Sequence, residues 1–237
     1  MKVMDLSPKK ILFVLLFTAL VLIGGQINFS QLLGGDENQF FTFFQFFGPI
    51  AGGILGSAIG AVSVLLAEII NFVFAGNEIS LVNIGRLLPM VFAAIYFGSD
   101  SAKKLSAIIP IVAMALFIVH PVGAQVWYYA VVFWSIPLIV KFFAPKNLFF
   151  RSLGATLTAH SVGGVLWIYA FNTTPELWNF LFFSGTVVFE RLLFAIGISV
   201  SFVLMTTFLA RVEHLLPTGT VSLDKKYDLS RVFASRA

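Results

Sequence analysis

The sequence predicts an all-α membrane protein, a polytopic helical bundle with about six transmembrane helices plus a short or re-entrant segment and with both termini cytoplasmic. Of its 237 residues, 59% are hydrophobic and only 11% are charged, whereas a soluble domain carries about 25% charged residues. Long apolar runs alternate with short polar loops, and Lys and Arg gather in only some of these loops. We therefore expect a multi-pass protein of the plasma membrane, with the lipid bilayer as its first partner.

The first predicted span follows a short basic start, residues 1–10. Residues 11–23 form an unbroken apolar run, and the apolar residues after them can extend it toward the roughly 20 residues that a span requires. The run could alternatively be a signal peptide, but no small-x-small cleavage site follows it. The loop 34–39 is acidic and has no Lys or Arg, so we expect it to lie outside.

A glycine-rich helix is predicted over residues 48–74, after an aromatic interfacial stretch at 40–47. Small residues would let neighbouring helices approach closely, and the lack of water in a bilayer preserves such a helix. At 100° per residue, Asn71 shares a face with Gly53, and Glu68 lies one turn before Asn71. This face would therefore bring a carboxylic acid and an amide to one end of the helix. The glycines predicted to serve this packing are Gly48, Gly52, Gly53, Gly56 and Gly60.

The next segment, residues 82–98, is predicted to be short and tilted or re-entrant, because its uninterrupted apolar part covers only residues 87–97. Further spans are expected at 105–119, 125–143, 153–171 and within 180–209. The basic loop 141–151 belongs inside and the neutral-to-acidic loop 172–176 outside. These placements predict a transmembrane domain over residues 1–211 and a basic cytoplasmic tail over 212–237.

Ionisable side chains at membrane depth are costly unless they are paired or hydrated, which makes them functional candidates. Glu190 and Arg191 would point about 100° apart on a helix, so we expect them not to serve only each other. Glu68 with Arg191, or Glu190 with Arg86, would neutralise the charges. Purely structural pairs of this kind are an equally good interpretation.

A second candidate group lies on one helical face, where His160, Gly164 and Trp167 follow at i, i+4 and i+7. They offer a hydrogen-bonding group, a gap and an aromatic wall, which suits a small polar or heteroaromatic ligand. The alternative is a histidine bonded to helix backbone and a tryptophan in the interfacial belt. His120, followed by Pro121, is expected to cap or hinge a helix end.

Aromatic residues also gather near the expected outer interface. Most are predicted to be belt residues, although one or two could roof an outward-facing pocket. They are Trp127, Tyr128, Tyr129 and Trp178.

Several function classes lack support. The chain has no Cys, no His-x-x-x-His spacing for a metal, and no Walker A, Gly-x-Ser-x-Gly or His-Glu-x-x-His motif. The net charge of +4 is explained by cytoplasmic loops rather than by nucleic-acid binding. We therefore expect neither an enzyme nor a bound metal or cofactor.

The segment 47–61, Phe-Gly-Pro-Ile-Ala-Gly-Gly-Ile-Leu-Gly-Ser-Ala-Ile-Gly-Ala, resembles the second-helix region of S components, the substrate-binding membrane subunits of energy-coupling-factor (ECF) vitamin transporters. The predicted size, crossings and short loops are similar too. Two features depart from that family: the basic tail after Arg211, and a first helix without an Ala-x-x-x-Ala face. The resemblance implies capture of a vitamin-like small molecule and work with a separate coupling subunit and ATPases.

The sequence thus favours a membrane-embedded substrate-binding subunit. The alternatives are a non-transporting assembly or sensor module that uses the tail, and an ion-coupled carrier that uses Glu68 and Glu190. The residues expected to line the binding site are Glu68, Asn71, Arg86, His160, Trp167, Glu190 and Arg191.

Overall fold

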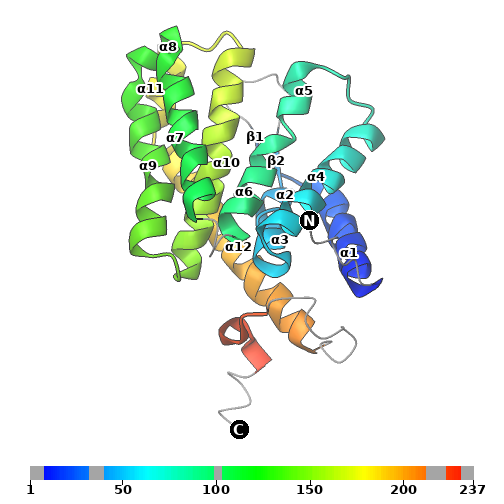
Figure 1. Ribbon diagram of the computed structural model, residues 1–237. Coiled ribbons are helices and arrows are strands. Elements are labelled where there is room, and N and C mark those ends of the chain that lie inside the picture. The colour runs from blue at the N-terminus through cyan, green and yellow to red at the C-terminus, as the bar shows by residue number, and fades with distance from the viewer. Residues whose placement is uncertain (1–7, 32–39, 99–102, 212–222, 231–237) are drawn as a thin grey trace.

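The computed structural model describes residues 8–31, 40–98, 103–211 and 223–230, and these form a helical bundle (Figure 1). Most of the long helices run side by side along the long axis of the bundle, as expected for the composition of a membrane protein. The elements in chain order are α1 (Pro8–Gly25), β1 (Asn28–Gln31), β2 (Phe40–Thr42), α2 (Phe44–Phe47), α3 (Ile50–Leu55), α4 (Ser57–Phe74), α5 (Leu81–Gly85), α6 (Leu88–Gly98), α7 (Lys103–Val119), α8 (Pro121–Gln125), α9 (Trp127–Phe143), α10 (Leu148–Ala170), α11 (Pro175–Phe183), α12 (Thr186–Arg211) and the 3-10 turn η2 (Lys225–Tyr227).

Three helical stretches in the described part of the chain are long and apolar enough to cross a membrane: Ser57–Phe74, Leu81–Gly98 and Thr186–Arg211. Shorter apolar helices cover Phe44–Leu55, Ser106–Val119 and Trp127–Phe143. The helical fold is therefore confirmed, and three helices of this length and composition indicate association with a membrane, whereas the count of about six spans remains a prediction. The described ranges also include a short antiparallel pair, in which β1 lies beside β2.

The predicted continuous helix over 48–74 is wrong, because the chain breaks at Gly56. Gly56 has φ +83° and separates α3 from α4, and a backbone with positive φ disfavours any residue with a Cβ. A Cβ on Gly56 would meet no atom within 4 Å, so this glycine permits a turn and does not pack a helix. The shared helical face from Gly53 to Asn71 is lost with the break.

The other glycines of this stretch do pack closely, in a geometry that one straight helix could not produce. The turn folds α4 back on α3, so that a Cβ on Gly60 would lie 2.5 Å from the Cα of Gly52. Gly52 also faces α6, where its Cβ would lie 2.7 Å from the carbonyl carbon of Ala94. Gly48 lies against Met90, and Gly53 against Phe97 and Phe202. The small residues therefore join three segments, α3, α4 and α6.

The segment predicted to be short, 82–98, is interrupted by a turn at residues 86–87 between α5 and α6. Its full length is nevertheless sufficient to span a bilayer. The short apolar segment is instead Phe44–Leu55, which precedes the turn at Gly56. An interruption is therefore present within 82–98, but the short apolar helix lies earlier in the chain than predicted.

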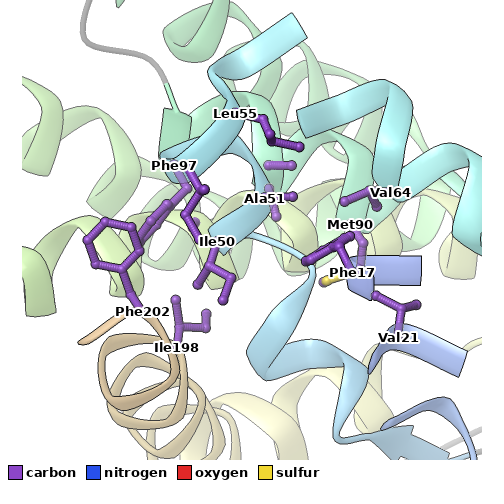
Figure 2. Packing of buried hydrophobic residues seen from close by; sticks show 14 of the residues in the cluster. Phe17, Val21, Ile50, Ala51, Leu55, Val64, Met90, Phe97, Ile198 and Phe202 are labelled. Carbon is purple, nitrogen blue, oxygen red and sulfur yellow. The ribbon is translucent and has the colours of Figure 1, made fainter. Parts of the chain in front are cut away.

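Two groups of buried side chains hold the bundle together. The first joins α1, α3, α4, α6 and α12, and Figure 2 shows Ile50, Phe97, Ile198 and Phe202 packed within it. The second centres on Phe117, Tyr129 and Trp134, which are fully buried between α7 and α9. Helix α10 packs against α6, α7, α9 and α12, so it connects the two groups and carries its own side chains into the middle of the molecule.

Two basic side chains hold the end of α6. The Nζ atom of Lys141 donates to the carbonyl of Tyr96 at 2.9 Å, and Nε of Arg151 donates to that of Phe97 at 2.6 Å. These carbonyls belong to the last turn of α6, where backbone acceptors have no helical partner and cations are favoured. Lys141 is only 8% exposed. The residues that the sequence marks as loop charges therefore also stabilise the tertiary structure.

The described part of the predicted tail, residues 223–230, lies against the end of α12 (Figure 1). The ring of Tyr227 packs edge-on against that of Phe202, with their centroids 5.6 Å apart, and its hydroxyl donates to the carbonyl of Lys146 at 3.4 Å. The backbone N–H of Leu229 donates to the hydroxyl of Thr207 at 3.1 Å. This part of the tail therefore contacts the bundle directly.

Candidate ligand-binding cavity

A cavity of about 360 Å³ lies among α4, α5, α6, α10 and α12, a volume suited to a small organic ligand. Its exposed rim includes Asn77 and Arg86, from the segments that follow α4 and α5. In Figure 1 these segments lie at the upper end of the bundle, whereas η2 lies at the lower end. The cavity is therefore near the end of the bundle opposite the described part of the tail.

All seven residues expected to form a binding site line this one cavity, although they come from four regions of the chain. The structure therefore brings them together, while their contact with a ligand remains a prediction. They are Glu68, Asn71, Arg86, His160, Trp167, Glu190 and Arg191.

Glu68 and Asn71 come from α4 and reach the cavity from the same wall, as their spacing of one turn predicts. The carboxylate of Glu68 makes no hydrogen bond or ion pair with another described residue. Asn71 accepts a long hydrogen bond of 3.4 Å from Nε2 of Gln26, which follows α1. Both side chains are partly buried, so α4 presents an acid and an amide to the cavity even though its connection to Gly53 is broken.

Arg86 stands at the turn between α5 and α6, where the backbone interruption exposes its side chain beside the cavity. Its guanidinium also has no hydrogen bond or ion pair within the described ranges. It is close enough to Glu68 for its charge to act on that carboxylate. Acid and base thus face one cavity without forming a direct ion pair.

Glu190 and Arg191 form an ion pair although they are neighbours on the helix, and they do not serve only each other, because Arg191 also bonds Thr156. The Nη2 atom of Arg191 lies 3.0 Å from Oε2 of Glu190, and the two side chains are 5% and 17% exposed. Consecutive residues on a helix point about 100° apart. Long side chains can nevertheless bend back along the helix surface, so the ends of Glu190 and Arg191 can meet. Arg191 also donates to the hydroxyl of Thr156 at 3.5 Å and lies over the ring of Phe194.

His160 enters the cavity from the middle of α10. Its Nε2 lies 3.2 Å from the hydroxyl of Tyr129, and its buried Nδ1 has no hydrogen-bond partner among the described residues. The alternative of a histidine bonded to helix backbone is therefore wrong. A buried ring nitrogen without a partner costs free energy unless something satisfies it, and Nδ1 of His160 is such a group in the lining of this cavity.

Aromatic side chains cover much of the remaining wall. Trp167 lies at a centroid distance of 4.3 Å from Phe171, and both line the cavity. Tyr129 and Trp178 line it too and are 0% and 2% exposed, so these two of the four aromatics are not interfacial belt residues. The possibility that one or two of these aromatics roof a pocket is the one the structure supports. Trp127, at 53% exposed, fits the belt.

Several further polar residues line the cavity and were not predicted from the sequence. Asn77 precedes α5 and Asn83 lies within it, and Thr42, Gln45 and Thr186 come from other elements. The side chain of Asn83 is fixed near the start of α5, because its Nδ2 donates to the carbonyl of Glu78 at 3.0 Å. Loop amides carry no periodic signal, and only the folded arrangement reveals them.

His120, expected to cap or hinge a helix, caps α8, and its Nδ1 accepts from the N–H of Val122 at 3.3 Å. This prediction is confirmed. Within the described residues, no group of three His, Cys, Asp or Glu side chains is placed to hold a metal ion.

The charges that line the cavity are balanced. Its carboxylates and guanidiniums number two each, and one pair of them is joined at 3.0 Å. Donors, acceptors and aromatic faces converge on the same space, as is typical of small-molecule sites. No family model, curated protein or solved structure matches this chain.

Proposed function

We propose that this protein is a membrane-embedded substrate-binding subunit that captures a vitamin-like small molecule from outside the cell and works with a separate ATPase module. The observation that carries the proposal is that one cavity of about 360 Å³ gathers charged, amide, imidazole and aromatic groups. Charged side chains are expensive to place at membrane depth. Four of them around one cavity are better explained by a polar ligand than by packing alone.

The proposal includes the finer topology: about six crossings, as expected for apolar segments of this length, with both termini cytoplasmic and the cavity open to the outside. The basic end of the bundle supports this orientation, since Lys141, Lys146 and Arg151 lie there together with the described part of the tail. Basic residues favour the cytoplasmic side. The likeness of residues 47–61 to S components of ECF transporters supports the link to a coupling subunit and ATPases.

The test is retention of a small molecule by the purified full-length protein, read by mass spectrometry after denaturation. The wild-type protein is expected to release one compound in a stoichiometric amount. His160→Ala and the charge-neutral double variant Glu68→Gln/Arg86→Gln are expected to release far less, because all three residues line the cavity. Glu176→Gln and Arg211→Ala are matched controls, because both residues are exposed and outside the cavity lining. Undiminished retention in the cavity variants, each shown to be folded by its thermal unfolding, would refute the site.

An assembly or sensor module is the second candidate, favoured by the contact of residues 223–230 with α12. It predicts that deletion of 212–237 abolishes function while Glu68→Gln and Arg86→Gln are tolerated. Co-purification decides between the two candidates, because a coupling subunit and ATPases are expected only for the transporter subunit.

A further inference from the structure

The charge arrangement in the cavity deepens the proposed function, on which this inference rests, by indicating what kind of molecule would bind. Glu190 and Arg191 are joined in an ion pair within one helix at 3.0 Å, and Arg191 has a further partner in Thr156. Glu68 and Arg86, in contrast, come from α4 and from the turn between α5 and α6. With no hydrogen bond or ion pair to other described residues, these two are the charges available to a ligand.

A ligand with charge of only one sign would fit this pair poorly. An anion that met Arg86 would add negative charge beside Glu68, and a cation that met Glu68 would add positive charge beside Arg86. Like charges brought together in a partly desolvated site repel strongly. A molecule with an ammonium group and a carboxylate matches both walls and leaves the cavity neutral.

The body of the ligand is indicated by the aromatic part of the same cavity lining. Trp167 and Phe171 lie on α10 and at its end, and Trp178 on α11. Aromatic side chains favour an apolar or ring-shaped group, which packs on their faces. Beside them, Nδ1 of His160 has no hydrogen-bond partner among the described residues and can take part in one further hydrogen bond.

We propose that the ligand of this cavity is a small zwitterion with an aromatic body, whose cationic group is bound by Glu68 and whose carboxylate is bound by Arg86. The pair formed by Glu190 and Arg191 then acts as a fixed neutral wall. Selectivity comes from the need to satisfy two opposite charges at once, because either one left alone in the cavity is unfavourable.

The experiment compares three probes that share one ring: phenylalanine, 2-phenylethylamine and 3-phenylpropionate. Each is titrated calorimetrically into the full-length protein in lipid nanodiscs. Phenylalanine is expected to bind about tenfold or more tightly than either single-charge analogue, since a hydrogen bond to a charged group contributes roughly that much. Glu68→Gln should abolish its advantage over 3-phenylpropionate, and Arg86→Gln its advantage over 2-phenylethylamine.

Glu78→Gln and Arg211→Gln are the matched controls, because each removes one exposed charge outside the cavity lining; both should keep the wild-type order. Equal or tighter binding of a single-charge probe, an unchanged order in both cavity variants, or no binding of any probe would overturn the aromatic zwitterion. Mass spectrometry of the retained compound then separates the two proposals. A retained molecule of one charge sign refutes only this inference, whereas no retained molecule refutes the binding function as well.

Discussion

Gly52→Ala is expected to destabilise the bundle more than any other single methyl addition among the glycines of α3. The new Cβ would overlap the carbonyl group of Ala94, with 2.7 Å to its carbon, and would lie 3.0 Å from the backbone nitrogen of Gly98. On its other side Gly60 of α4 is already in contact. All of these neighbours are backbone atoms, so no side-chain rotation can relieve the overlap.

The magnitude follows from two opposing effects. Overpacking of a well-packed interior costs about 1–3 kcal/mol, and the upper end applies here because two helices would have to separate. Alanine recovers up to about 1 kcal/mol of helix propensity relative to glycine in water. We expect a net loss of about 2 kcal/mol or more in the free energy of unfolding.

The measurement is equilibrium unfolding in mixed detergent micelles, followed by tryptophan fluorescence. Gly163→Ala is the matched control, because Gly163 is also helical and its added Cβ would meet only Cγ of Pro89 at 3.9 Å. It should leave stability unchanged or slightly higher. Gly52→Ala within about 0.5 kcal/mol of the wild type would show that the three segments do not meet in the tight contact described above.

Three further substitutions test the packing that holds α6 and α10. Tyr96→Phe removes a buried hydrogen bond of 2.8 Å to the carbonyl of Pro137 and should cost about 1–2 kcal/mol of unfolding free energy. Its control is Tyr169→Phe, which loses an exposed hydrogen bond and should cost less. Equal losses in the two variants would show that burial does not strengthen the bond of Tyr96. Lys141→Met keeps the aliphatic stem but leaves the carbonyl of Tyr96 without its 2.9 Å donor, for an expected loss of about 2 kcal/mol in the same assay; a neutral outcome would show that water replaces the ammonium. Asn147→Ala removes the side chain that caps α10 by accepting from the N–H of Phe150, and it should cost about 1 kcal/mol of unfolding free energy. Asn147→Asp should retain the cap and the stability. A similar loss in both variants would refute the capping role.

Composition and local spacing predict the helical fold and the relations between residues that lie within one or two helical turns. The helical membrane fold follows from the apolar runs, and the helix boundaries near Phe143, Ala170 and Arg211 follow from where polar residues resume. A capping or hinge role for His120 follows from its place beside Pro121 at a helix end, and His120 caps α8. Glu68 and Asn71 remain on one face of α4 because their relation spans only one turn.

Errors arose where a local rule was extended over a distance. The four-residue spacing of the glycines predicts one straight helix with a single packing face. The same residues are instead packed closely because the chain turns at Gly56 and brings Gly60 against Gly52. Periodicity records which residues are small and cannot record where the backbone reverses. The roles of Lys141 and Arg151 in holding α6 were also invisible, because their acceptors lie 45 and 54 residues away along the chain.

The amino-acid sequence by itself determined that this chain has the composition of a membrane protein and that it is helical. It also identified the polar residues within the apolar segments. Each of these depends only on hydrophobicity and short-range spacing. Only the tertiary structure decided that residues from α4, the α5–α6 turn, α10 and α12 share one cavity. It also decided that Arg191 pairs with Glu190 while Glu68 and Arg86 face the same space apart. The physical reason is that such meetings depend on how helices pack across long sequence separations, which one-dimensional periodicity does not encode.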